Sequence, residues 1–192
     1  MILLLHYFLT VFNIAAAGFI KNDLYHPNFC GPSPLPLTDT MIDHAQHLIK
    51  SYQTLTSENL LSDDEDHLDP FDAASRLFYH PSQIVLSHGV QDHKDGPILN
   101  YGNSLALKRW GVSWEQLTAM PSSKTAEAML QKERDQFMRS VKEKNLIRGY
   151  SGIRISCDGA RFLIRNATVW NIIIDGKYLG QSATFSQWKE LN

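Results

Sequence analysis

The spacing of apolar residues predicts that the folded part of the chain begins with two helices. Over residues 38–61, apolar positions recur every three or four residues, which is typical of an amphipathic helix. These positions are Met41, Ala45, Leu48, Ile49, Tyr52 and Leu55. A second helix is expected after Asp69, a good helix cap that Pro70 follows, and it ends before Pro81.

The pattern then changes to two short strands and further helices. Residues 84–86 and 98–101 are short apolar runs that end near glycine, which favours strands. Asn103 is expected to cap a helix that ends at Gly111, because asparagine accepts hydrogen bonds from free helix amides and glycine adopts the left-handed ending. Ser113 and Gln116 form a capping box for another short helix. A long charged helix is expected over residues 126–145.

Three longer strands are expected to complete the chain, over residues 150–156, 161–174 and 178–188. The turns between them contain Asp158-Gly159 and Asp175-Gly176. Aspartate-glycine between apolar runs is a strong hairpin signal, because a type I′ turn needs positive φ at both central residues. The three strands are therefore predicted to be consecutive antiparallel neighbours.

The strand over residues 161–174 is apolar on both faces. Strict alternation places Phe162, Ile164, Thr168, Trp170 and Ile172 on one face. It places Leu163, Ala167, Val169 and Ile173 on the other, outer face. Such a strand needs cover on both sides, so the outer face is expected to contact either the N-terminal helices or another protein. In the first case the helix over residues 41–55 would pack near Leu163 and Val169, and in the second the face would bind a partner or a second copy.

Composition excludes several classes of function. The chain has 192 residues and a formal net charge of −2, without a dense run of Lys or Arg, so nucleic acid is not an expected partner. Cys30 and Cys157 are the only cysteines and are far apart, which excludes a cysteine zinc site.

The first 37 residues are expected to lie outside the fold. Residues 1–20 are nearly all apolar and are compatible with a secretory or transit signal, a membrane anchor, a buried helix or a start codon upstream of the true one. Residues 21–37 are a proline-rich linker. A cytoplasmic location is expected if residues 1–20 are not a targeting segment. Otherwise the protein is secreted, organellar or membrane-anchored, and only a retained anchor would bring it to a membrane.

No residue pattern points to an enzyme. Ser87 and His88 are adjacent on a predicted strand, so their side chains point to opposite faces and cannot form a catalytic pair. No nucleophile elbow, phosphate-binding glycine loop or metalloprotease motif is present. His44 and His47 share a predicted helix face, but solvent-facing histidines are the commoner explanation, and no metal site is predicted.

Aromatic and polar residues suggest a cavity for a small ligand. The candidate lining residues are Tyr101, Asn103, Trp110, Trp114, Phe137, Phe162, Ile164, Thr168 and Trp170. Trp170 and Phe137 are expected on opposite walls. The alternative is a solid core, because large apolar side chains at core spacing usually fill volume.

Four segments resemble the MEKHLA domain, a relative of PAS domains. They are PILNYGN at 97–103, WG at 110–111, YSGIRI at 150–155 and GQSATF at 180–185. The resemblance extends back to about residue 38. It implies an α+β fold: a PAS-like antiparallel five-stranded sheet with helices between strands two and three and an N-terminal helical extension. The helices are assigned to residues 38–80 and the PAS-like domain to residues 81–192.

MEKHLA domains occur alone in bacterial and algal proteins and at the C-terminus of class III homeodomain leucine-zipper proteins of plants, where a sensory or regulatory role has been proposed. This chain resembles the stand-alone type, because it contains neither homeodomain nor zipper heptads. The resemblance implies a non-enzymatic sensory module. The alternative is an interaction or dimerisation module that has a solid core.

Cofactors of PAS relatives can be compared with the residues present. The long charged helix contains neither His nor Cys, which disfavours haem, and Cys157 lies beside a hairpin turn, which disfavours a covalent flavin adduct. A non-covalent flavin or a small organic ligand remains compatible with the sequence.

Overall fold

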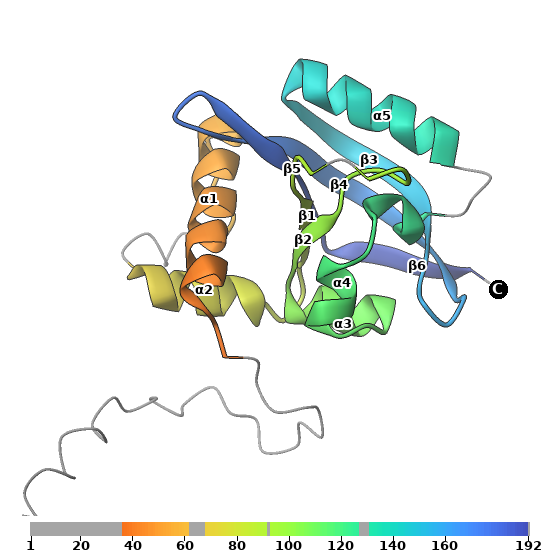
Figure 1. Ribbon diagram of the computed structural model, residues 1–192, viewed down its shortest axis with the longest axis horizontal. Coiled ribbons are helices and arrows are strands. Elements are labelled where there is room, and N and C mark those ends of the chain that lie inside the picture. The colour runs from red at the N-terminus through yellow and green to blue at the C-terminus, as the bar shows by residue number, and fades with distance from the viewer. Residues whose placement is uncertain (1–35, 62–67, 92, 127–130, 192) are drawn as a thin grey trace, which may run out of the picture. The chain divides into compact units, whose positions relative to one another are not determined.

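A computed structural model describes residues 36–61, 68–91, 93–126 and 131–191 (Figure 1). The expectations for residues 1–20 and for nearly all of the proline-rich linker lie outside this part of the chain. The helices are α1 (Asp39–Thr56), α2 (Pro70–Phe78), α3 (Ser104–Trp110), α4 (Trp114–Thr118), the 3-10 helix η2 (Ser122–Thr125) and α5 (Gln131–Lys144). Among the described residues, no helix combines the length and apolar character that a bilayer span requires.

The strands form one antiparallel sheet. They are β1 (Ile84–His88), β2 (Leu99–Gly102), β3 (Leu146–Ile155), β4 (Arg161–Ile174), β5 (Lys177–Phe185) and β6 (Gln187–Leu191). Their order is β2-β1-β5-β4-β3, and β6 also pairs with β4. The last three predicted strands are therefore neighbours as expected, but the final one is divided at Ser186 into β5 and β6, so that the sheet has six strands.

The helix caps are those that the sequence predicts. The side chain of Asn103 accepts a hydrogen bond from the Ala106 amide, and Gly111 ends α3 with a φ of 66°. Ser113 and Gln116 form the complete capping box of α4. Asp69 caps α2 through the amides of Phe71 and Asp72. These local signals need no tertiary contact, because each satisfies helix amides that would otherwise lack partners.

The two aspartate-glycine turns differ. Asp175 and Gly176 both have positive φ, 50° and 76°, as the predicted type I′ turn requires. At the first turn only Gly159 is left-handed, with a φ of 85°. Asp158 instead accepts hydrogen bonds from the Ser156 hydroxyl and the Ala160 amide. The prediction of a type I′ turn at Asp158 is therefore wrong, because this carboxylate stabilises a longer loop.

An irregular position in β4 changes which face its residues occupy. Asn166 has a φ of 51°, so the chain gains one residue there, and both Ile164 and Ala167 are buried in the same core cluster. On the neighbouring side of β4, the chain is interrupted at the same level, between β5 and β6. Pairing with β4 therefore continues on both sides of the irregular position, with Thr168 opposite Thr184 and Arg165 opposite Gln187. The sequence prediction assumed strict alternation and assigned the residues after 166 to the wrong faces.

The helices α1 and α5 contact opposite faces of the sheet. Trp170 of β4 is fully buried and donates a hydrogen bond from Nε1 to Ser51 Oγ of α1, at 3.0 Å. Its ring meets that of Tyr52 edge-on, with centroids 5.0 Å apart. The next residue, Asn171, bonds to the end of α5 instead. Figure 1 shows α1 and α5 on different sides of the central strands.

Candidate functional site

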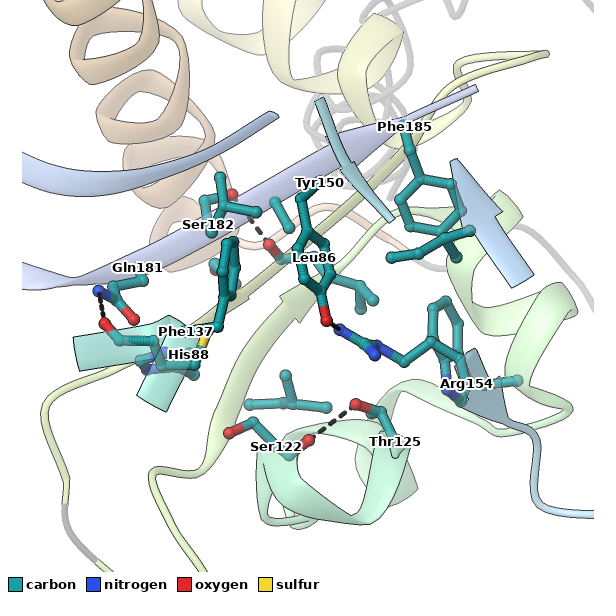
Figure 2. A pocket seen from close by; sticks show the side chains of 17 residues that line it. Leu86, His88, Ser122, Thr125, Phe137, Tyr150, Arg154, Gln181, Ser182 and Phe185 are labelled. Atoms are coloured by element: carbon teal, nitrogen blue, oxygen red, sulfur yellow. Dashed lines mark hydrogen bonds between the residues drawn. The ribbon is translucent and has the colours of Figure 1, made fainter. Parts of the chain in front are cut away.

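An inner cavity of about 70 Å³ lies between the sheet and the segment that carries η2 and α5 (Figure 2). Every strand from β1 to β5 contributes to it. Its residues are Leu86, Ser87, His88, Leu99, Trp110, Ser122, Thr125, Phe137, Met138, Tyr150, Arg154, Ile164, Val169, Gln181, Ser182, Ala183 and Phe185. The cavity therefore combines an apolar floor with several hydrogen-bonding side chains.

An aromatic stack forms one side of the inner cavity. The rings of Phe137 and Tyr150 lie 3.9 Å apart at 24°, which places α5 against β3. Tyr150 Oη accepts a hydrogen bond from Arg154, at 3.2 Å, and Arg154 also donates to the Ile153 carbonyl (Figure 2). Gly152 makes room for this arrangement, because a Cβ atom there would lie 2.9 Å from Cζ of Tyr150. The guanidinium group is thus held beside the cavity by a phenol and a carbonyl oxygen.

Two buried amides connect the sheet to α5. Gln181 donates hydrogen bonds from Nε2 to the Met138 carbonyl at 3.1 Å and to Asn171 Oδ1 at 3.0 Å. Asn171 in turn donates to the Lys142 carbonyl at 3.1 Å and to Asn145 Oδ1 at 2.8 Å. Gln181 and Asn171 are only 3% and 1% exposed. Because buried amides are costly without partners, these bonds hold α5 in place over the cavity.

The structure brings together three of the nine predicted lining residues. Trp110, Phe137 and Ile164 line the inner cavity. Phe162 lies behind it, in the core, with its ring 5.2 Å from that of Trp110. Asn103 is fully buried and accepts from the Val85 and Ala106 amides, so its side chain is committed to holding β1 and α3 together.

The other four predicted residues lie elsewhere. Tyr101 and Trp114 line a second cavity of about 120 Å³, the outer cavity, together with Thr40, Met41, His44 and Asn100. Thr168 and Trp170 lie on the α1 side of the sheet, because the extra residue at Asn166 reverses their direction. The prediction that Trp170 and Phe137 form opposite walls of one cavity is therefore wrong.

The predicted outer sheet face also changes. Ala167 and Val169 are buried on the inner side, where Ala167 joins the core cluster and Val169 lines the inner cavity. Leu163 and Ile173 are partly exposed. The helix α1 covers the outer face as expected, but it does so through Trp170 and not beside Val169. Leu163, Ala167, Val169 and Ile173 therefore do not form one surface. Binding of a partner stays a prediction for Leu163 and Ile173, which are partly exposed.

Sequence reasoning did not find the polar residues of the inner cavity. Gln181, Tyr150 and Arg154 belong to the GQSATF and YSGIRI segments that carry the family resemblance, so those segments held the available signal. His88 lines the cavity with its Nδ1 2.9 Å from the Gly89 carbonyl, while Ser87 bonds to His44 on the other side. The opposite directions of Ser87 and His88 agree with the prediction.

A family model for the MEKHLA domain matches residues 42–190. The match includes every lining residue of the inner cavity, and of the outer cavity all but Thr40 and Met41. The chain belongs to the MEKHLA domain family. None of the curated proteins matches the chain.

Solved structures support the expected fold of this MEKHLA protein. A PAS domain from Colwellia psychrerythraea is similar with a TM-score of 0.51 and 14% identity, over 64% of this chain and 98% of that one. An RNA-binding light-oxygen-voltage receptor is similar with a TM-score of 0.50 and 12% identity, over 70% of this chain and 35% of the receptor. At these identities the likeness concerns the fold, and it confirms a PAS-like α+β sheet with an N-terminal helix.

Proposed function

We propose that this MEKHLA domain is a sensory module in which a small ligand in the inner cavity changes how α1 packs on the sheet. The observation that supports this best is that neighbouring side chains of β4 and β5 point to opposite faces of the sheet. Val169, Asn171 and Gln181 face the inner cavity or α5, whereas their neighbour Trp170 bonds to Ser51 of α1. A shift of these strands therefore reaches α1 without any intermediate element.

The cavity volume restricts the ligand. A water molecule needs at least about 10–15 Å³ and benzene occupies an engineered cavity of about 150 Å³. A cavity of about 70 Å³ therefore suits a molecule of a few non-hydrogen atoms. A three-ring flavin would require the Phe137–Tyr150 stack to open, so we propose a small organic ligand in place of a flavin.

The polar lining suggests how such a ligand would act. A polar molecule near Gln181 would compete with the Met138 carbonyl for the amide hydrogens, and this carbonyl belongs to α5. Loss of that bond would loosen the attachment of α5 and move β5. Arg154 adds a second donor, and its cation favours ligands that carry an acceptor or a negative charge.

We propose binding without catalysis. The hydroxyl of Ser87 is 2.8 Å from Nε2 of His44, but it donates its own hydrogen to Asn100 Oδ1, at 2.7 Å. His44 then donates to Ser87 and does not act as its base. The pair therefore supports α1 and does not activate a nucleophile.

NMR of the full chain would test the sensory role. The probes are acetamide, propionate and flavin mononucleotide, added separately to isotope-labelled protein. We expect acetamide or propionate to shift the amide signals of Gln181 and Tyr150 and also those of Ser51 and Tyr52 on α1. Gln181→Leu should remove both sets of shifts, whereas Gln187→Leu, an exposed change on β6, should not. Shifts confined to the inner cavity would contradict transmission to α1.

A second candidate function is an interaction module, which the partly exposed pair of Ile153 and Leu163 favours. These residues are directly opposite each other on β3 and β4, where they offer adjacent apolar side chains. Light scattering after size-exclusion chromatography would test self-association. If the full chain is a dimer through this pair, Leu163→Glu should produce a monomer, whereas Arg161→Glu should not. A dimer unchanged by Leu163→Glu would exclude this surface.

A further inference from the structure

A residue that lines the outer cavity, Tyr101, carries a buried hydroxyl group that lacks a hydrogen-bond partner among the described residues. Tyr101 is 1% exposed, and no donor or acceptor in the described part of the chain bonds to its Oη atom. Burial raises the pKa of Tyr101, so the group is a neutral phenol that can donate one hydrogen bond. Buried polar groups almost always have partners, and Tyr101 lines the outer cavity, so a ligand in this cavity is a candidate partner for the hydroxyl group.

The polar groups beside Tyr101 are also neutral. His44 donates from Nε2 to Ser87, which leaves its Nδ1 as an acceptor. Burial lowers the pKa of His44 from 6.5 to about 4, and the nearby His47 adds to this, so the ring is uncharged at neutral pH. Asn100 contributes an amide. The cavity therefore offers donors and an acceptor without a formal charge.

The shape of the outer cavity limits the occupant to one small ring. Its volume is about 120 Å³, somewhat below the roughly 150 Å³ of a cavity that accepts benzene. The rings of Tyr101 and Trp114 meet edge-on at 5.9 Å and provide two apolar sides at nearly a right angle, and Met41 provides another apolar contact. Thr40 is exposed and Trp114 is half-buried, so a ligand can reach the cavity between the first turn of α1 and α4.

We infer that the outer cavity is a binding site for a small neutral ring compound that accepts a hydrogen bond from Tyr101. A charged ligand is disfavoured, because it would lose its hydration on entering the cavity and the lining residues include no ionised group that would compensate this loss. The ligand would contact both α1 and β2, so its binding strengthens the attachment of α1 to the sheet. This site is separate from the inner cavity, and the inference does not rest on the proposed sensory role.

Pyrazole is a suitable probe, because it is a five-membered ring that is neutral at pH 7.5 and carries one acceptor and one donor. We expect saturable shifts of the Tyr101 and Trp114 signals when pyrazole is added to the full chain, and a higher melting temperature. Thiophene, which lacks both hydrogen-bonding groups, and pyrrolidine, a cation at this pH, should bind about tenfold more weakly or not at all.

Two variants locate the site. Tyr101→Phe removes only the hydroxyl and should weaken pyrazole binding about tenfold without lowering the melting temperature of the free protein, since the lost group has no protein partner. Tyr178→Phe is the matched control. Thr40→Tyr changes an exposed residue at the mouth of the cavity and should block pyrazole, whereas Thr54→Tyr on the same helix should not.

Three results would overturn the inference. The first is equal binding of pyrazole to wild type and Tyr101→Phe. The second is thiophene binding as tightly as pyrazole, which would show a merely apolar cavity. The third is the absence of saturable pyrazole binding together with a buried water bonded to Tyr101 Oη, which would make the cavity a site for ordered water only.

Discussion

Removing the Trp170 side chain should detach α1 from the sheet. Trp170 is fully buried, packs edge-on against Tyr52 and donates a hydrogen bond to Ser51, so one side chain joins β4 to α1 through both packing and a hydrogen bond. Truncation of a buried tryptophan to alanine typically costs ~3–5 kcal/mol. Because the total free energy of unfolding of such a domain is ~5–15 kcal/mol, the Trp170→Ala protein should be only marginally folded.

The hydrogen bond can be separated from the packing. Trp170→Phe keeps an aromatic ring against Tyr52 but removes the Nε1 donor, and Ser51→Ala removes the acceptor. A double-mutant cycle over these changes should give a coupling of about 1 kcal/mol, the usual net value of one such bond. Urea unfolding of the full chain, followed by circular dichroism, would measure each free energy of unfolding.

The control is Trp188→Ala. Trp188 is only half-buried and its ring is 6.2 Å from that of Phe185, so its removal should cost less than Trp170→Ala and should leave the amide exchange of α1 unchanged. A Trp170→Ala protein that loses under about 1 kcal/mol and keeps α1 protected from hydrogen exchange would refute the view that this residue attaches α1.

Three further predictions concern stability. Asn103→Ala should lower the free energy of unfolding in urea by ~2–4 kcal/mol, because the fully buried Asn103 accepts hydrogen bonds from the Val85 and Ala106 amides. The control Ser113→Ala, which removes an exposed helix cap, should cost only ~1 kcal/mol. Gly180→Ala should lower the melting temperature strongly, since φ is +142° and a methyl group would overlap the His88 carbonyl oxygen; a melting temperature equal to wild type would contradict this geometry. The pKa of His44 falls from 6.5 to about 4 on folding, so below pH 6.5 the unfolded chain binds a proton that the folded chain does not, and stability should decrease by ~1.4 kcal/mol per pH unit down to about pH 4. His44→Gln should lack that slope, and an equal slope in both proteins would exclude His44 as its source.

Local sequence signals determined most of the secondary structure. Asp69, Asn103 and Ser113 cap helices where the sequence predicts, and Gly111 and the Asp175-Gly176 turn adopt left-handed backbone as expected. Each of these features depends on residues within a few positions along the chain, so local chemistry is sufficient to find it. The order of the last three strands follows from their short connections in the same way.

The cavities depended on the tertiary structure. A single left-handed residue, Asn166, reverses the faces of β4, so that Trp170 packs under α1 and Val169 lines the inner cavity. Asparagine tolerates this conformation but does not require it, so the sequence alone does not reveal the irregularity. The contact of Gln181 with α5 and the position of Tyr101 beside His44 join segments far apart in the chain, and only the folded sheet brings them together.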